Sequence, residues 1–349
     1  MYILGIDTSC DDTSAAVVAD EGRVLSNVVH TQVRLHHPHG GVVPELASRE
    51  HLRNMTPVVQ EALSGAGIRL RELDGIAVTV GPGLIGSLLV GLYYGKALAY
   101  SHQIPLVAIN HLEGHILSIF LETHVPSFPF VALTVSGGHT SLYHVEGYGR
   151  YVQLGQTLDD AAGEAFDKVA KILGLGYPGG EVIEEKAGHG LAGRIRFPRA
   201  FLSKDSLDFS FSGLKTAVAL YIKKWRDAEG QTCAVTVADI AASFQEAVID
   251  VLVHKVMTAG RMMGVSAVAV AGGVACNGRL RARMLEAGED EGIRVYFPRP
   301  AYCTDNGAMI ALAGYHRITL GEQADLSVDA RSRYPIQDLL SSDSRGMIG

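Results

Sequence analysis

The sequence has few cysteines and more acidic than basic residues. Its four cysteines, Cys10, Cys233, Cys276 and Cys303, are far apart and form no C-x-x-C pair. This spacing argues against a cysteine zinc site or a disulfide framework, and it is typical of a reducing, cytoplasmic compartment. Lysine and arginine number 30 against 37 aspartates and glutamates, a formal net charge of −7. Proteins that coat nucleic acid regardless of sequence are normally basic, so that class is disfavoured.

Long apolar runs are also scarce. The one stretch that resembles a membrane span, residues 83–100, contains Lys96 and three interior glycines and is marginal in length. We therefore predict a buried helix there and no membrane partner. The chain has 349 residues, 47% of them hydrophobic, which is enough apolar material for about two folded domains.

Short β-branched runs alternate with longer helical segments, which predicts an α/β architecture with helices on the faces of the sheets. Strands are expected at residues 3–6, 15–18, 24–29, 76–80, 106–109, 130–135, 141–145, 267–271 and 294–297. Helices are expected at residues 44–63, 84–101, 111–121, 159–173, 212–225, 238–263, 277–291 and 306–319. Residues 188–208 lack periodicity and are expected to run as a long excursion over the surface.

A weak internal repeat indicates a duplicated domain. Residues 3–18 and 130–145 both read as a strand, a small polar turn and a second strand. Two such hairpins predict two similar halves with a nucleotide cleft between them. The first half is expected to comprise residues 1–110 plus about 300–330, and the second residues 111–299 with insertions. Residues 331–349 are expected to form a tail.

Glycine is abundant, at 40 of 349 residues, and it gathers in turns that follow expected strands. These turns lie at residues 7–10, 81–83, 136–138 and 271–278. Backbone N–H groups of glycine turns can close on an anion, so turns on both halves predict a bound nucleotide. No turn matches G-x-x-x-x-G-K-[ST] or a G-x-G-x-x-G after the first strand, which disfavours P-loop and dinucleotide folds.

Three acids, Asp160, Glu164 and Asp167, would share one face if residues 159–173 form one helix. Two interpretations stay open from the spacing alone. The stripe is either solvated, or it provides a carboxylate that accepts hydrogen bonds from ribose hydroxyls or an amine.

His111 and His115 have the i, i+4 spacing of metal ligands on one helix face. In the zinc-protease pattern H-E-x-x-H a glutamate follows the first histidine. Here Glu113 is at i+2, roughly 200° round the helix, so a protease general base is missing. Asp305, in the segment Cys303–Met309 that opens a helix, is the best third ligand. Two histidines and a carboxylate suit iron(II) or zinc with open positions.

The residues leave three classes of function open. A chaperone-like, ATP-dependent binding module would use the nucleotide turns without needing the histidine pair. A non-haem iron enzyme would use the ligand triad without needing the turns. A metalloprotease is the least favoured, because Glu113 faces away from the pair.

Ten collinear motifs, from residue 5 to about residue 310, resemble those of one family. They are Gly5–Asp11, Gly40–Arg49, Gly81–Gly83, His111–His115, Val135–Thr140, Asp159–Lys168, Tyr177–Gly180, Asp208–Thr216, Ala271–Val274 and Cys303–Met309. On these motifs the chain resembles the bacterial TsaD (formerly Gcp) family, the tRNA N6-adenosine threonylcarbamoyltransferases. The resemblance implies the actin-like fold of sugar kinases and heat-shock ATPases, with two subdomains and a nucleotide cleft.

The same resemblance implies an acyl transfer. The threonylcarbamoyl group of threonylcarbamoyladenylate passes to N6 of adenosine 37 in tRNAs that read codons beginning with A, and AMP leaves. It implies one divalent metal on His111, His115 and Asp305, with iron(II) favoured and zinc possible. Adenylate contacts are implied for Thr134, Val135, Ser136, Gly137, Gly138, Asp167, Gly180 and Asn277. The implied partners are TsaB and TsaE, with TsaC as the source of the adenylate.

Two acids are the expected catalytic groups. Asp11 is expected to assist removal of the proton from the attacking amine. Asp12 stands where relatives often carry glutamate, so its role is less secure than that of Asp11. Position 134 is threonine where relatives often have an apolar or aromatic residue, so only the backbone of Thr134 is expected to matter.

The expected acceptor is a polyanion, yet the chain is acidic. Arg279, Arg281 and Arg283 form a local basic run, which is expected to be solvated rather than bound to RNA. We therefore expect this chain alone to bind tRNA weakly, with a partner subunit completing the basic surface.

Overall fold

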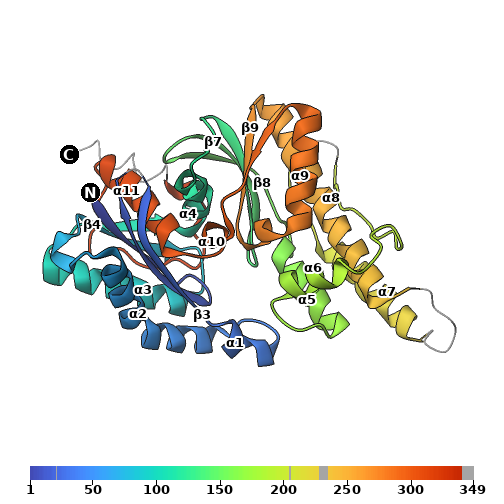
Figure 1. Ribbon diagram of the computed structural model, residues 1–349, viewed down its shortest axis with the longest axis horizontal. Coiled ribbons are helices and arrows are strands. Elements are labelled where there is room, and N and C mark those ends of the chain that lie inside the picture. Colours follow the sequence, from blue (N-terminus) through green and yellow to red (C-terminus); the bar gives the residue numbers. More distant parts are fainter. Residues whose placement is uncertain (21, 204–205, 228–234, 340–349) are drawn as a thin grey trace. The chain divides into compact units, whose positions relative to one another are not determined.

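The computed structural model describes residues 1–20, 22–203, 206–227 and 235–339, so Cys233 lies outside the described residues. The chain divides into two units (Figure 1). Unit 1 comprises Met1–Val125, Gly147–Tyr151 and Pro298–Gly349, and unit 2 comprises Pro126–Glu146 and Val152–Phe297. These units differ from the expected division: the first runs to Val125 rather than residue 110, and it also takes in the expected tail.

Unit 1 is built on a five-stranded sheet with the order β3-β2-β1-β4-β5. The strands are β1 (Tyr2–Asp7), β2 (Asp12–Ala19), β3 (Arg23–Thr31), β4 (Gly75–Gly81) and β5 (Leu106–Asn110). β1 pairs antiparallel with β2 and parallel with β4, and β4 pairs parallel with β5. The helical elements are α1 (Val33–His36), η1 (His37–His39), α2 (Pro44–Ala66), η2 (Leu70–Glu72), α3 (Ile85–His102), α4 (His111–Leu117), η3 (Ser118–Leu121), α10 (Pro300–Cys303) and α11 (Gly307–Thr319).

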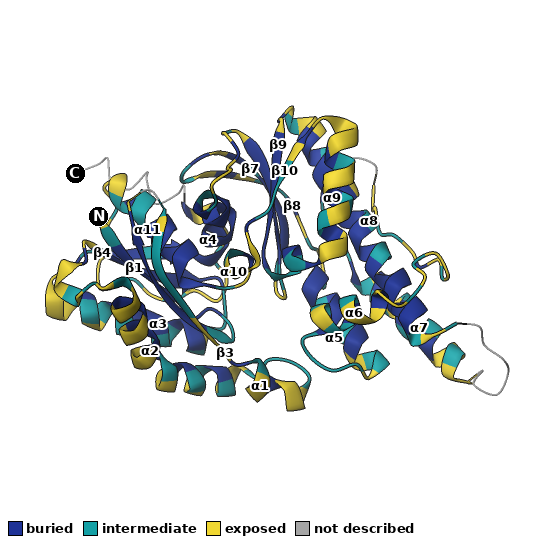
Figure 2. Ribbon diagram, viewed as in Figure 1, coloured by how far each residue is buried: buried dark blue, intermediate teal, exposed yellow. Residues whose placement is uncertain are grey.

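Side chains of β1 alternate between two cores, which explains why the strand reads as an unbroken apolar run. Leu4 and Ile6 pack with Met55 of α2 and Leu92 of α3 on one face of the sheet. Ile3 packs with α11 and with the segment after α4 on the other face. Gly5 permits this close approach, because a Cβ there would lie 2.2 Å from the carbonyl oxygen of Gly307. Figure 2 shows the resulting burial of β1 and β4.

Unit 2 repeats the sheet, with the order β10-β9-β6-β7-β8. Its strands are β6 (Phe130–Val135), β7 (Thr140–Gly147), β8 (Arg150–Gln156), β9 (Ala267–Ala271) and β10 (Arg294–Tyr296). β6 pairs antiparallel with β7 and parallel with β9, as β1 pairs with β2 and β4 in unit 1. β9 pairs parallel with β10, as β4 pairs with β5. The helical elements are α5 (Ala162–Leu173), α6 (Gly179–Ala187), α7 (Ser212–Asp227), α8 (Val237–Met263), η4 (Gly273–Cys276) and α9 (Gly278–Glu291). The predicted duplication is therefore confirmed by strand order and pairing.

Several predicted elements differ in their bounds. β8 and α6 were not expected, and the helix predicted from residue 159 begins at Ala162. Asp160 therefore precedes α5 and binds Lys168 and Lys215, so the predicted three-acid helix face is wrong. The excursion at 188–208 has no helix or strand in its described part, but Phe197 and Leu207 are buried. In the described part of the chain, no helix is both long and apolar enough to cross a membrane.

Candidate metal centre and nucleotide-binding turns

The two histidines stand on α4, directly after strand β5. Asn110 caps this helix, because its side-chain oxygen accepts the backbone N–H of Leu112 at 2.9 Å. The cap makes His111 the first helical residue and places His115 one turn later. Their ring centroids are 4.6 Å apart, so the predicted face-sharing pair is confirmed.

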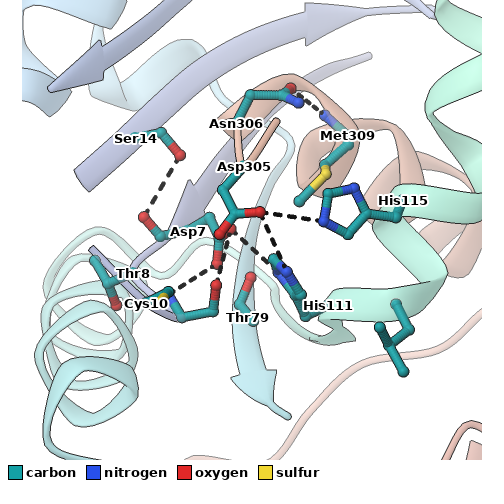
Figure 3. A network of polar contacts seen from close by, with 12 residues as sticks. Asp7, Thr8, Cys10, Ser14, Thr79, His111, His115, Asp305, Asn306 and Met309 are labelled. Atoms are coloured by element: carbon teal, nitrogen blue, oxygen red, sulfur yellow. Dashed lines mark hydrogen bonds and ion pairs between the residues drawn. The ribbon is translucent and has the colours of Figure 1, made fainter. Parts of the chain in front are cut away.

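Asp305 lies against both imidazoles (Figure 3). One of its carboxylate oxygens is 3.1 Å from Nε2 of His115 and 3.4 Å from Nε2 of His111. One ligand atom from each of the three residues lies within 4.8 Å of those of the other two. Two imidazoles and a carboxylate are a donor set suited to zinc or iron(II). The triad predicted from sequence is therefore assembled, and it is consistent with a single metal ion.

Burial alone would disfavour the protonated imidazolium of His111, but the nearby carboxylates of Asp305 and Asp7 outweigh it and raise the pKa of His111 to about 10. Asp305 is half-buried, and loss of solvent favours its neutral form, yet His111 and His115 hold its pKa well below the usual range. The carboxylates of Asp7 and Asp305 therefore favour a positive charge at His111. The raised pKa of His111 favours its protonated form in the metal-free chain, and a bound cation would replace that proton.

Asp7 is a site residue that the sequence analysis missed. It ends β1, is fully buried, and places Oδ2 3.2 Å from Nδ1 of His111. Its Oδ1 accepts the backbone N–H of Ser9, which fixes the carboxylate. Asp7 thus contacts one ring nitrogen of His111 while the other faces Asp305, the arrangement that orients metal-bound histidines.

Replacing Asp7 with asparagine is expected to weaken metal binding by about 10–100-fold, because His111 loses the carboxylate that orients its ring. Titration of the metal-free chain with Zn²⁺ measures this effect. Asp74→Asn is the matched control, since Asp74 accepts the backbone N–H of Tyr2 at the other end of β1. Equal zinc affinities for Asp7→Asn and the unchanged chain would contradict this role.

Of the two expected catalytic acids, Asp11 lies between β1 and β2, and Asp12 is the first residue of β2. Asp11 and Asp12 are half-buried. Burial and then the charge of Asp305 raise the pKa of Asp12 to about 8, and burial also raises the pKa of Asp11. A cation beside Asp305 would lower both pKa values and favour the carboxylate forms.

A histidine that the sequence analysis did not identify contacts this segment. His51 of α2 is buried, and its Nε2 lies 2.9 Å from the carbonyl oxygen of Cys10. Its Nδ1 lies 2.7 Å from the hydroxyl of Thr13. His51 thus contacts the residues on both sides of Asp11 and Asp12, through the backbone of Cys10 and the hydroxyl of Thr13. This contact was not predictable from the sequence, because His51 lies about 40 residues from Cys10 and Thr13 along the chain.

Glu113 does not face the metal centre. Its buried carboxylate accepts hydrogen bonds from Arg317 at 2.8 Å and from the hydroxyl of Tyr151 at 2.9 Å. The prediction that Glu113 turns away from the histidines is therefore confirmed. A protease general base is not provided by this glutamate.

In unit 2, the segments expected to bind the adenylate contact one another in a closed ring. The carbonyl of Ser136, in the turn after β6, accepts the N–H of Gly163 at the start of α5. Asp167 of α5 accepts the N–H of Gly179 at 2.7 Å, at the start of α6. Glu184 of α6 accepts the N–H of Gly278, at the start of α9, at 2.7 Å. Gly272 closes the ring, because it lies so near Val135 that a Cβ added at Gly272 would be 2.4 Å from the carbonyl oxygen of Val135.

At three positions of this ring, neither packing nor backbone conformation requires a glycine. At Gly137, Gly138 and Gly180, an added Cβ would meet no atom within 4 Å, and none of the three has a positive φ. Gly272 differs, because its φ is +98° and its neighbour is too close for a Cβ. Open space above unstrained glycines is what a ligand that approaches the backbone requires.

The other predicted adenylate residues already have structural contacts. Thr134 and Val135 are buried in β6, which leaves the backbone at the strand end as the accessible part. Asn277 caps α9: its Oδ1 accepts the N–H of Leu280 at 2.9 Å and its Nδ2 donates to Gln245 at 2.8 Å. Asp167 uses one oxygen on Gly179.

The family described as tRNA N6-adenosine threonylcarbamoyltransferase matches residues 23–312. Relatives with that name match nearly end to end. The protein from Syntrophus aciditrophicus is 52% identical over 96% of this chain and 98% of its own length. The protein from Desulforapulum autotrophicum is 53% identical over 95% of this chain and 99% of its own.

Solved structures with the same fold are more distant in sequence. HypF of T. kodakarensis has a TM-score of 0.61 and 15% identity, covering 92% of this chain and 48% of its own. The activator of 2-hydroxyisocaproyl-CoA dehydratase from Clostridium difficile, with bound ADPNP, has a TM-score of 0.52 and 14% identity, covering 94% and 100%. At these identities the likeness shows the fold alone, and the predicted actin-like α/β architecture is confirmed.

Proposed function

Because the chain belongs to the tRNA N6-adenosine threonylcarbamoyltransferase family, we propose that it transfers threonylcarbamoyl from threonylcarbamoyladenylate to N6 of adenosine 37 in tRNA. The substrate tRNAs are those that read codons beginning with A, and the reaction is cytoplasmic. The triad of His111, His115 and Asp305, whose two histidines are buried, carries this proposal. A protein that only bound and hydrolysed ATP would have no need for it.

The chemistry requires no covalent enzyme intermediate. The adenine amine forms a bond to the carbonyl carbon of the threonylcarbamoyl group, the bond from that carbon to the phosphate oxygen breaks, and AMP leaves with the electron pair. The amine gives up one proton. The protein must therefore orient the amine and the carbonyl. It must also stabilise the negative charge that develops on the carbonyl oxygen and on the leaving phosphate oxygen.

We assign the metal to the threonylcarbamoyl end of the donor. His111, His115 and Asp305 would hold it, with Asp7 orienting His111. Iron(II) is our first choice and zinc the second, from the donor types. When bound, the metal supplies Lewis-acid polarisation and a fixed template for the donor.

Asp11 is our choice for the group that takes the proton from the amine, with Asp12 beside it. His51 holds the carbonyl of Cys10, which fixes the backbone from which both acids extend. A base must be a carboxylate at the working pH. Burial and then Asp305 raise the pKa of Asp12 to about 8, so Asp12 is largely protonated at neutral pH unless a cation lies beside Asp305.

The adenylate phosphate is assigned to the backbone of Ser136, Gly137 and Gly138. Gly138→Ala is expected to weaken AMP binding by about tenfold or more at unchanged thermal stability, because its Cβ would occupy the space reserved for the ligand. Calorimetric titration with AMP measures this. Gly193→Ala is the matched control, since a Cβ there also meets nothing within 4 Å but lies outside the ring. Equal AMP affinities would remove the phosphate assignment.

The basic run on α9 does not present free arginines. Arg279 binds Glu246 at 2.9 Å, and Arg283 contacts Glu246 and Asp250. This pairing supports weak tRNA binding by the isolated chain. We propose that TsaB and TsaE complete the active assembly and that TsaC supplies the adenylate.

The isolated chain is expected to bind tRNA weakly at near-physiological salt, and more tightly once TsaB and TsaE are added, because a phosphate must compete with the carboxylates that these arginines already bind. A tRNA titration with and without the two partners measures the change. Tight binding and full transfer by this chain alone would contradict the partner proposal.

One assay separates the transferase from an ATP-dependent binding module. The complete assembly receives tRNA and preformed threonylcarbamoyladenylate in the absence of ATP, and the digested nucleosides are analysed by mass. Modified adenosine is the expected product. Turnover of ATP with no modified adenosine from the adenylate would favour the binding module instead.

A further inference from the structure

A buried ion pair joins the two elements that supply the metal ligands. Glu113 of α4 and Arg317 of α11 have side chains only 1% and 5% exposed. Nη2 of Arg317 donates to Oε1 of Glu113 at 2.8 Å, and Nε lies 3.2 Å from both oxygens. Glu113 lies between His111 and His115 in sequence, and Arg317 lies on the helix that begins two residues after Asp305.

The two helices also touch where no side chain intervenes. A Cβ added at Gly114 would lie 2.8 Å from Cδ1 of Ile310 and 3.2 Å from Cγ of Met309. Gly114 thus lets α4 lie directly on the first turns of α11. The Glu113–Arg317 pair holds the same two helices together near the end of α11.

Both members of the pair are held by further partners. Nη1 of Arg317 donates to Glu322 at 2.8 and 2.9 Å, and the hydroxyl of Tyr151 donates to Glu113 at 2.9 Å. Burying two charges costs about as much as their attraction returns, so such a pair is a weak source of net stability. A fixed geometry is what a pair with this many directed contacts does provide.

We propose that Glu113, held by Arg317, is a positioning residue for the metal centre. It sets the placement of α4 on α11, and so the distance from His111 and His115 to Asp305. It touches neither the metal ligands' reacting atoms nor the substrate. This inference rests on the proposed metal site, and it assigns a task to the buried glutamate that faces away from the two histidines.

Binding of Co²⁺ to the metal-free chain tests the proposal, because the visible spectrum of the ion reports ligand geometry. Glu113→Gln keeps the size of the side chain but removes its charge. We expect at least a tenfold loss of Co²⁺ affinity and a changed spectrum. Glu72→Gln is the matched control, since it removes the charge from another glutamate held by an arginine, Arg69, at 2.8 and 2.9 Å.

A milder variant covers the case in which Glu113→Gln does not fold. Tyr151→Phe removes one hydrogen bond to Glu113 and keeps the ring, so it is expected to lower Co²⁺ affinity about threefold with a shifted spectrum. Unchanged affinity and spectrum in every folded variant, while the unchanged chain binds Co²⁺, would overturn the positioning role. Failure of the unchanged chain to bind Co²⁺ would instead contradict the metal site itself.

Discussion

Replacing both His111 and His115 with alanine is expected to abolish metal binding and to lower threonylcarbamoyl transfer by at least about 10³-fold. The double variant leaves Asp305 as the sole remaining ligand of the triad. The lost Lewis-acid contribution is several kcal/mol, and each 1.4 kcal/mol is a factor of ten in rate. Metal analysis and a single-turnover transfer assay measure the two effects.

The matched control replaces His37 and His39, two exposed histidines of η1 in the same unit. That variant should keep its metal and its transfer rate. Circular dichroism of both variants shows whether the fold is retained. A folded His111/His115 double variant with normal metal content would refute the ligand assignment.

Arg317→Met is expected to destabilise the protein by about 3–5 kcal/mol, because it leaves the buried carboxylate of Glu113 without its cation. The methionine fills much of the volume of the arginine, so the loss reflects the unpaired charge rather than a cavity. Chemical denaturation, followed by a probe in unit 1, measures the change in the free energy of unfolding.

Two further variants separate charge from packing. The double variant Glu113→Leu with Arg317→Met removes both charges and is expected to recover much of the lost stability. Arg299→Met breaks the Arg299–Glu122 pair, whose arginine side chain is 54% exposed, and should cost less than about 1 kcal/mol. If Arg317→Met were no more costly than Arg299→Met, the burial argument for the pair would be wrong.

The sequence predicted those parts of the fold whose pattern is local. The hairpins β1–β2 and β6–β7 were evident because each is a β-branched run on either side of a small polar turn. β8 was missed, since its sequence Arg150–Gln156 mixes polar and apolar residues without a buried run. α6 was missed because it begins with two glycines, Gly179 and Gly180, that read as part of a turn.

The metal triad was predictable because two of its ligands lie four residues apart on one helix. Its supporting residues were not, because their contacts span long sequence distances. Asp7 reaches His111 from the end of β1, and Arg317 reaches Glu113 from α11. Neither shows a spacing that distinguishes it from an ordinary strand-end or helix-surface charge.

The acidic stripe on α5 was predicted wrongly for a physical reason. Asp159 accepts hydrogen bonds from the backbone of Phe211 and the hydroxyls of Ser210 and Ser212, which fixes the chain before the helix. Asp160 is drawn instead to Lys168 and Lys215. The periodic spacing of the acids predicted a helix from residue 159. The side chains of Asp159 and Asp160 instead bind other segments of the chain, and α5 begins at Ala162.

Transfer as a function of bound metal tests the account most directly. The metal-free chain, with its partners, tRNA and preformed adenylate, is titrated with iron(II), and modified adenosine is quantified by mass after digestion of the tRNA. The account predicts no product without metal and a rise that saturates at one ion per chain. Full product formation by the metal-free chain would contradict it.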